Sequence, residues 1–158
     1  MIEKDEIVSF LPHRGRMLLL DKINSYNLEE RTICAEYHIT EECLFYDPAI
    51  KAVPAWVGFE FIAQTISALM GLWYRARGEE PKIGFILSIS SMKMALPFFK
   101  TGSIVELRVK EGDCMNQVFT YEGEAFLEGR KVIEGKLMVM EANEEQIKSM
   151  LKENDSIG

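Results

Sequence analysis

Residues 54–78, which read PAWVGFEFIAQTISALMGLWYRARG, decide the fold. Within this stretch, apolar side chains recur every three or four residues, which is the period of an α-helix. Further apolar residues widen that stripe until it covers most of the helix surface, as is typical of a helix buried inside a protein. Pro54 favours a first helical turn, and Gly78 favours a stop just beyond the last one. We therefore predict a buried central helix over about residues 54–77.

The segments around this helix have the alternating pattern of β-strands. Two strands are expected before the helix, at 17–26 and 31–40, and four after it, at 82–90, 103–112, 117–129 and 131–142. Short helices are predicted at 2–10 and 143–153. Because only one long helix lies among these strands, repeated βαβ units do not fit. The order favours a single α+β domain over residues 1–158, in which a curved antiparallel sheet wraps around the central helix.

The composition narrows the classes of function. The chain has 158 residues, a net charge of −7 and a pI near 5.0, which disfavours nucleic-acid binding. Its three cysteines are odd in number and have no zinc-binding spacing, so we expect free thiols in the cytoplasm. Two histidines and scattered cysteines supply no metal site. Polar residues within the central helix, from Glu60 to Arg77, argue against a membrane span.

Glu60 is the unusual residue of the central helix, because it is a carboxylate among apolar side chains. In a helix its neighbours are Trp56, Val57, Ala63 and Gln64, so we expect its ionised form to be poorly solvated. A carboxyl group in such a position is suited to proton exchange with a substrate, and Gln64 is placed to orient it by a hydrogen bond. The alternative is an ordinary half-exposed glutamate that the helix dipole favours. Periodicity does not choose between the two.

The start of the helix offers a second feature. Ala55 and Trp56 carry backbone N–H groups without a partner inside the helix, and such groups can polarise a carbonyl oxygen. Two stretches, LPHRGRMLLLDKI (11–23) and VPAWVGFEFIAQ (53–64), resemble motifs of the bacterial 3-hydroxyacyl-acyl-carrier-protein dehydratases. Those enzymes have the hotdog fold, and the likeness runs from about Val8 to Ala142. The resemblance implies the same fold here, in agreement with the order of the strands.

The resemblance also implies roles for individual residues. Glu60 matches the catalytic acid of the family, Gln64 matches its helix glutamine, and the Ala55 and Trp56 amides match the donors to the thioester oxygen. The second catalytic group of the family is a histidine fourteen residues before the acid, where this chain has Tyr46. Tyrosine is a poor base at neutral pH. This sequence is most similar to the branch associated with aryl-polyene-type pathways, which likewise lacks that histidine.

Other residues are candidates to complete the site. His13, in the LPHR motif, is a candidate substitute for the missing histidine, although loop packing is the simpler interpretation. Asp47 is a weaker candidate base, because a loop carboxylate before proline is more often a turn residue. Arg14, with Lys93 and Lys100, is a candidate for binding the phosphate of phosphopantetheine or an acidic carrier protein. The alternative is that these basic residues only interact with solvent.

By this resemblance the protein is a homodimeric 3-hydroxyacyl-thioester dehydratase of fatty-acid or polyene-type lipid synthesis. Its substrate would be carried on acyl carrier protein or coenzyme A, with no further cofactor. The family places the active site at the dimer interface and runs an acyl tunnel along the helix. A higher oligomer and a heterodimer with another hotdog chain are alternative assemblies. Two other functions stay open, an acyl thioesterase and an inactive acyl-binding subunit that pairs with an active relative.

Overall fold

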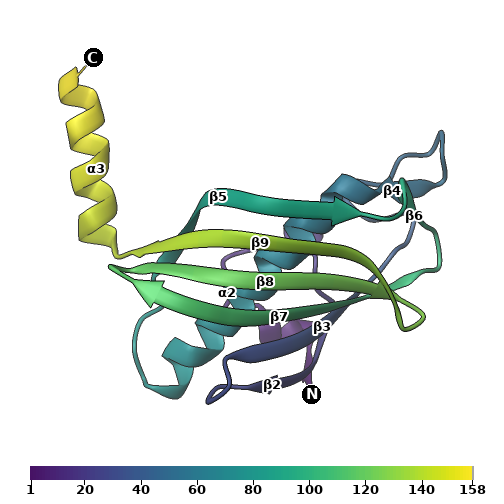
Figure 1. Ribbon diagram of the computed structural model, residues 1–158, viewed down its shortest axis with the longest axis horizontal. Helices are drawn as coiled ribbons and strands as arrows, with labels where there is room; N and C mark the ends of the chain where they lie inside the picture. The colour runs from purple at the N-terminus through teal and green to yellow at the C-terminus, as the bar shows by residue number, and fades with distance from the viewer. Residues whose placement is uncertain (158) are drawn as a thin grey trace.

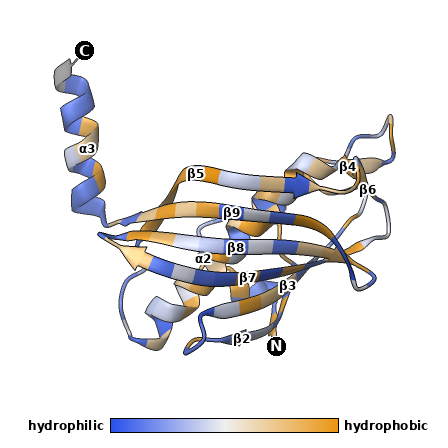
Figure 2. Cartoon of the chain, in the orientation of Figure 1, coloured by the Kyte–Doolittle hydropathy of each residue, from blue (hydrophilic) through white to orange (hydrophobic). Residues whose placement is uncertain are grey.

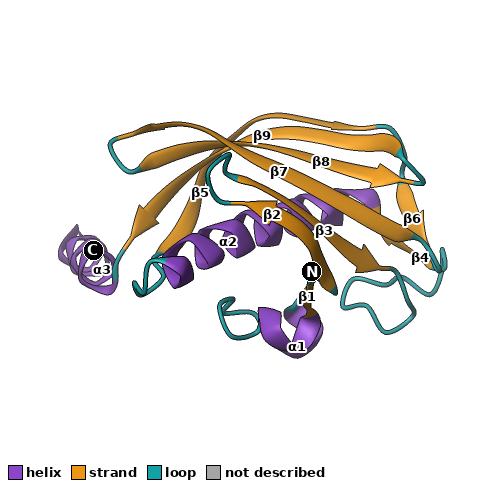
Figure 3. Ribbon diagram, turned by 90° about the horizontal axis from the view of Figure 1, so that it is seen from below, coloured by secondary structure: helices purple, strands orange, loops and turns teal. Residues whose placement is uncertain are grey.

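A seven-stranded antiparallel sheet curves around one long helix, α2 (Gly58–Ala76), in the computed structural model (Figure 1). From below the sheet, α2 is seen to cross its concave face (Figure 3). The structure describes residues 1–157, with side chains as far as residue 155. Gly158, the last residue of the predicted domain, lies outside the described residues. This arrangement of a sheet wrapped around a helix is the α+β hotdog fold.

Seven strands follow the order β1-β2-β3-β7-β8-β9-β5 across the sheet. Their bounds are Ile2–Glu3 (β1), Lys22–Asn27 (β2), Thr32–His38 (β3), Ile83–Met94 (β5), Ile104–Met115 (β7), Val118–Leu127 (β8) and Arg130–Ala142 (β9). A separate pair, β4 (Ala52–Pro54) and β6 (Phe98–Lys100), lies beside the start of α2. The short helices are α1 (Lys4–Ile7), α3 (Glu144–Ile157) and the 3₁₀ turns Gly15–Met17 and Ala55–Val57.

The strands over the helix bury every second side chain, as the period of two requires. In β3 the buried residues are Ile33, Ala35 and Tyr37, and in β7 they are Val105, Leu107 and Val109. These side chains face α2, which packs beneath β3, β7 and β8. The predicted alternation of these two strands is therefore confirmed.

Strands β5 and β7 and helix α3 end at Met94, Met115 and Ile157, several residues later than predicted. Three other predicted boundaries differ because of contacts between distant segments. The N-terminal helix is shorter than 2–10, because Ile2 and Glu3 pair with β2 instead of starting a helix. Pro54 ends strand β4 opposite Phe98, so the central helix begins with a 3₁₀ turn and not at Pro54. Met17 belongs to a 3₁₀ turn and not to the strand that was expected at 17–26. In each case a tertiary contact overrides the local pattern.

Strand β5 differs from the strands over the helix, because it forms the edge of the sheet and, among the described strands, pairs only with β9. The apolar side chains of β5 do not lie on one buried face, since Ile83, Leu87 and Ile89 are 52%, 52% and 44% exposed. Figure 2 shows hydrophobic residues on β5 at this free edge. An apolar edge strand of this length is a surface suited to pairing with another chain.

Two helical features remain, one at the surface and one in the core. Helix α3 follows β9 and projects beyond the end of the sheet (Figure 1). Among the described residues, one helical segment, Ala55–Ala76, is long and apolar enough to cross a membrane, but 72% of its most apolar window is buried inside the fold. It is therefore the core helix of the domain.

Candidate active site

A groove remains between α2 and the β5–β9 edge, because α2 packs beneath the other half of the sheet. Part of this groove is a cavity of about 170 Å³ that is lined by α2, by Gly84 and Ile86 of β5, by Val139 of β9 and by His13. We call it the Glu60 cavity, since Glu60 lines it from the first turn of the helix. The cavity brings together segments that are far apart in the sequence.

One face of α2 forms the longest wall of this cavity. The α2 residues that line it are Glu60, Ala63, Gln64, Ile66, Ser67 and Met70, of which Glu60, Ala63, Ser67 and Met70 follow one another at spacings of three and four. Small and polar residues also occur elsewhere on this helix, among them Thr65, Ala68 and Gly71, so the sequence alone does not single out this stripe. The sequence analysis singled out only Glu60 and Gln64, and it missed Ser67 and Met70 as lining residues.

The Glu60 carboxylate is available for chemistry. Its residue is partly buried, and within the described part of the chain no hydrogen bond or ion pair reaches its oxygens. The side chains around it in the cavity include Ile66, Met70, Ile86 and Val139, which offer no charge to balance it. A partly buried carboxylate without a partner gains no ion-pair stabilisation from its surroundings.

His13 lines the same cavity as Glu60. Its Nδ1 atom is buried and has no hydrogen-bond partner among the described residues. Burial lowers the pKa of His13, the Glu60 charge raises it by a smaller amount, and Arg14 lowers it slightly. The imidazole is therefore mainly neutral at neutral pH, and a neutral imidazole can accept a proton.

Gln64 has a different role from the one expected. Its side chain is only 3% exposed, and both ends of the amide are engaged with the backbone of the N-terminal segment. Oε1 accepts a hydrogen bond of 2.7 Å from the N–H of Leu19, and Nε2 donates one of 2.7 Å to the carbonyl of Met17. The amide therefore anchors the segment that follows His13 to α2 and does not orient Glu60.

Four other predicted site residues do not line the Glu60 cavity of their own chain. The Ala55 N–H already donates to the carbonyl of Pro97, at 3.0 Å. Trp56 is 58% exposed and stacks edge-on against Phe45, with ring centroids 5.9 Å apart. Tyr46 is half-buried against the core, in the loop before β4.

Arg14, the fourth of these residues, is exposed beside His13. Its guanidinium donates to the carbonyls of Leu11 and His13, the latter at 2.8 Å. These bonds hold the loop and leave the outer side of Arg14 in solvent. Among the described residues, no group of three or more His, Cys, Asp or Glu side chains lies close enough to hold a metal ion.

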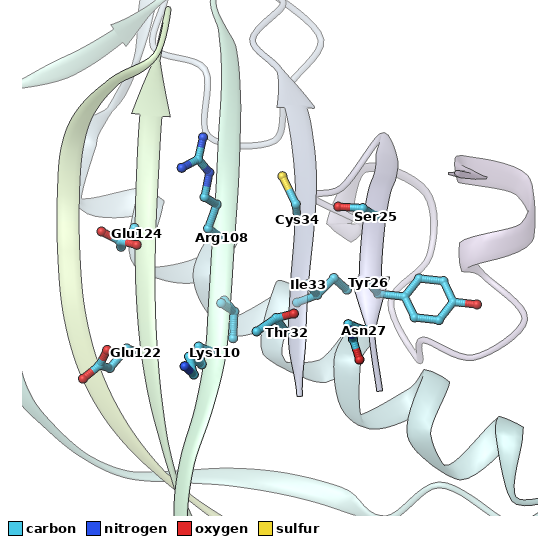
Figure 4. A pocket seen from close by; sticks show the side chains of 11 residues that line it. Ser25, Tyr26, Asn27, Thr32, Ile33, Cys34, Arg108, Lys110, Glu122 and Glu124 are labelled. Atoms are coloured by element: carbon cyan, nitrogen blue, oxygen red, sulfur yellow. The ribbon is translucent and has the colours of Figure 1, made fainter. Parts of the chain in front are cut away.

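A second cavity, of about 380 Å³, lies on the outer face of the sheet over β2, β3 and β7 (Figure 4). Arg108, Lys110, Glu122 and Glu124 point into it, together with Cys34. Burial raises the pKa of the Cys34 thiol, which disfavours the reactive thiolate. This cavity therefore lacks an activated group, unlike the Glu60 cavity on the inner side of the sheet.

Comparison with known proteins agrees with this geometry. The family model for ApeP-like proteins, described as ApeP dehydratase, matches residues 5–152. The 3-hydroxyacyl-[acyl-carrier-protein] dehydratase FabZ of Chlamydia trachomatis serovar L2 is 28% identical over 145 residues, which cover 90% of this chain and 94% of that protein. FabZ of Erythrobacter litoralis is 26% identical over 140 residues, covering 87% and 91% of the two chains.

Solved structures show the same fold. A chain of the dehydratase heterocomplex ApeI:P from Xenorhabdus doucetiae superposes with a TM-score of 0.83 at 19% identity, covering 92% of this chain and 96% of that one. A hypothetical thioesterase protein from Streptococcus pneumoniae, with coenzyme A, superposes with a TM-score of 0.60 at 9% identity, covering 77% and 88%. These likenesses show the fold alone, whereas the match to the family model is specific. With that match spanning nearly the whole sequence, the chain belongs to the ApeP-like family of hotdog dehydratases.

Proposed function

We propose that this protein dehydrates 3-hydroxyacyl thioesters, with Glu60 and His13 exchanging the two protons. The observation that carries the proposal is that a carboxyl group with no hydrogen-bond or ion-pair partner among the described residues and a neutral imidazole line one cavity along the central helix. Dehydration requires a base to remove the α-proton and an acid to protonate the departing hydroxyl. The thioester carbonyl itself acidifies the α-proton, so the chemistry requires no further cofactor.

In this mechanism the neutral His13 takes the α-proton from C2 and Glu60, in its protonated form, gives a proton to the hydroxyl on C3. The C2–H and C3–O bonds break, the C2–C3 double bond forms and water leaves. Return of the proton from His13 to Glu60 resets the site. The Trp56 N–H is the remaining candidate donor to the thioester oxygen, because the Ala55 N–H is bonded to Pro97.

The free edge of β5 supports assembly with another hotdog chain. Its exposed apolar side chains and its unpaired backbone groups would be covered if a second sheet continued across this edge. In such an assembly the Glu60 cavity, which β5 borders, lies next to the interface. We propose that Tyr46 of one chain then serves as a hydrogen-bond donor at the site of the other. The described heterocomplex of a structural relative supports a second type of hotdog chain as partner, and a homodimer is the alternative.

The acyl substrate would be carried on acyl carrier protein, as in the FabZ relatives, and the reaction would take place in the cytoplasm. Arg14, exposed beside His13, remains the candidate contact for the carrier phosphate. Light scattering of the purified protein, alone and with any hotdog chain that is encoded nearby, would determine the assembly before activity is measured.

The test of the function is a product analysis with 3-hydroxyacyl-carrier-protein substrates, followed by mass spectrometry. We expect loss of water in the wild-type protein and a decrease of at least about a hundredfold in Glu60→Gln. Glu30→Gln, in the exposed turn between β2 and β3, is the matched control and should retain activity. Release of free acid and thiol would instead establish a thioesterase. Tight acyl binding without any turnover would establish an acyl-binding subunit.

The role of His13 is tested separately through the pH dependence of the rate. If the neutral imidazole is the base, the rate should decrease on the acid side as His13 becomes protonated, at a pH below the ordinary value of 6.5. His13→Asn should reduce the rate and remove this acid limb. A larger loss in Tyr46→Phe than in His13→Asn at every pH would assign the second catalytic role to Tyr46 instead.

A further inference from the structure

The Glu60 cavity continues into a larger one along the same groove. This distal cavity has a volume of about 430 Å³ and is lined by the N-terminal segment from Ser9 to His13, by α2 and by the start of β5. The two cavities share four lining residues, His13, Ser67, Met70 and Gly84. Shared walls mean that they are two chambers of one groove.

The two chambers differ in size and in contents. The Glu60 cavity, at about 170 Å³, has room for roughly one benzene-sized group, since an engineered cavity of about 150 Å³ holds benzene. That is enough for a thioester carbonyl and the first few carbons of an acyl chain. The distal cavity is more than twice as large, and Phe10, Leu11 and Ile83 give it an apolar wall. Along α2 it reaches Gly71, which is about 16 Å from Glu60 at 1.5 Å per residue.

Met70 and Gly84 meet where the two chambers join. Met70 is 3% exposed, and its Cε and Sδ lie 3.2 and 3.4 Å from the point where a Cβ on Gly84 would be. The thioether therefore lies across the bare backbone of β5 and narrows the passage from the α2 side. Gly84 gives it the room to do so, because a side chain there would press on Met70 and on Val139.

From this geometry we propose that Met70 and Gly84 form a neck that sets the length of the acyl chain. The inference rests on the proposed function in so far as the groove must take an acyl chain. Short chains fit in the Glu60 cavity, and longer chains have to displace the Met70 side chain to reach the distal cavity. Methionine is unbranched and flexible, so the neck is adjustable rather than closed.

The test measures binding rather than turnover, with S-alkyl coenzyme A thioethers that cannot react. In the wild-type protein, affinity should rise by about fourfold for each added CH₂ up to the neck and by less beyond it, since one buried CH₂ contributes about 0.8 kcal/mol. Met70→Ala should extend the steep increase to longer chains, with a gain of about tenfold or more for the longest ones. Met70→Phe should reduce the affinity for long chains and leave that for the shortest chains within about twofold.

Two further variants complete the test. Gly84→Ala narrows the neck from the strand side and should act like Met70→Phe, which keeps the proposal testable if Met70→Ala does not fold. Met138→Ala makes the same chemical change at an exposed position on β9, away from the groove, and should leave the length profile unchanged. The inference is overturned if the wild-type protein binds no thioether, or if the Met70 and Gly84 variants change all chain lengths equally.

Together with the product analysis of the proposed function, this binding experiment separates the two proposals. If the length profile changes as expected but no 3-hydroxyacyl substrate is dehydrated, the proposed neck is supported and the proposed dehydratase activity is refuted. If water is lost but the length profile does not change in the Met70 and Gly84 variants, the proposed activity is supported and the proposed neck is refuted.

Discussion

At the first turns of α2, Glu60 faces a cavity and has no partner for its charge among the described residues, whereas beside the last turns Glu111 and Glu141 each have one. There, the Tyr74 hydroxyl donates to Glu141, which is only 4% exposed, and Arg31 forms an ion pair with Glu111. The Arg31 guanidinium also lies over the Trp73 ring, 4.2 Å from its centroid. The carboxylates near the two ends of α2 therefore differ, because, in the part of the chain that the structure describes, those beside the last turns are paired and Glu60 is not.

The difference between the two ends shows what each is for. A buried carboxylate that serves the fold is paired, because an unpaired charge in an apolar setting costs several kcal/mol. The pairs Tyr74–Glu141 and Arg31–Glu111, which together we call the Tyr74 network, meet this requirement. Glu60 has no such partner among the described residues, and it lies where the proposed function requires a carboxyl group. Stability and activity should therefore separate when the two ends are mutated one at a time.

The largest effect is expected for Glu60→Gln, in activity alone. Loss of the proton donor should reduce turnover by roughly 10² to 10⁴-fold, the usual contribution of a general acid or base. The midpoint of thermal unfolding should stay the same or increase, because a neutral amide replaces an unpaired carboxylate in the apolar cavity. Parallel assays and calorimetry on one preparation would check this. A clear drop in the unfolding temperature would show that Glu60 supports the fold and would erase the contrast with the Tyr74 network.

The next effect is expected for Arg31→Leu, in stability alone. Removing this side chain leaves Glu111 buried without its partner, which typically costs about 3–5 kcal/mol. Urea unfolding measured by circular dichroism would give this change. The double variant Arg31→Leu/Glu111→Leu is the control, because replacing both partners by apolar residues should recover most of the loss. If the double variant is as unstable as the single one, the Trp73 contact and not the ion pair is what Arg31 contributes.

A smaller loss is expected for Tyr74→Phe. The ring and its packing remain, but the Glu141 carboxylate loses the phenol that donates to it. Leaving a buried acceptor without its donor costs about 1–3 kcal/mol, which the urea midpoint should report. Acyl binding in the groove should not change, since Tyr74 lines neither chamber. Weaker thioether binding in this variant would mean that the two ends of α2 are coupled.

The two ends also differ in how far the sequence could predict them. Helical periodicity placed α2, and strict alternation identified β3 and β7, because each of these elements has a face that is buried against the others. The Glu60 position followed from the contrast between one carboxylate and its apolar neighbours. These are local signals that a single sequence contains.

The Tyr74 network could not be predicted in this way. Glu141 lies 67 residues from Tyr74 along the chain, and Arg31 lies 80 residues from Glu111, so only the sheet brings them together. The same holds for Gln64, whose bonds to Met17 and Leu19 span more than 40 residues and replaced the expected contact with Glu60. The pairing of Ile2 with β2 and of Pro54 with β6 likewise depends on partners that no local pattern specifies.

The smallest effect is a pH dependence that Glu111 should confer on stability. Burial raises the pKa of Glu111 above its usual value, and this outweighs the opposite influence of Arg31, while the charge of Glu141 raises it further. The folded protein therefore holds a proton on Glu111 at pH values where the unfolded chain has already released it.

Because the folded state then binds more protons than the unfolded state, the contribution of Glu111 to stability is fully present below pH 4.5 and is lost as the pH rises through the folded pKa. Urea midpoints at several pH values between acid and neutral should thus show the wild-type protein losing stability relative to Glu111→Gln as the pH rises. The constant offset from the broken ion pair cancels in this comparison. A gain of stability with rising pH would mean that the attraction to Arg31 exceeds the cost of burying the Glu111 charge. The Tyr74 network would then be stabilised mainly by the attraction between its charges.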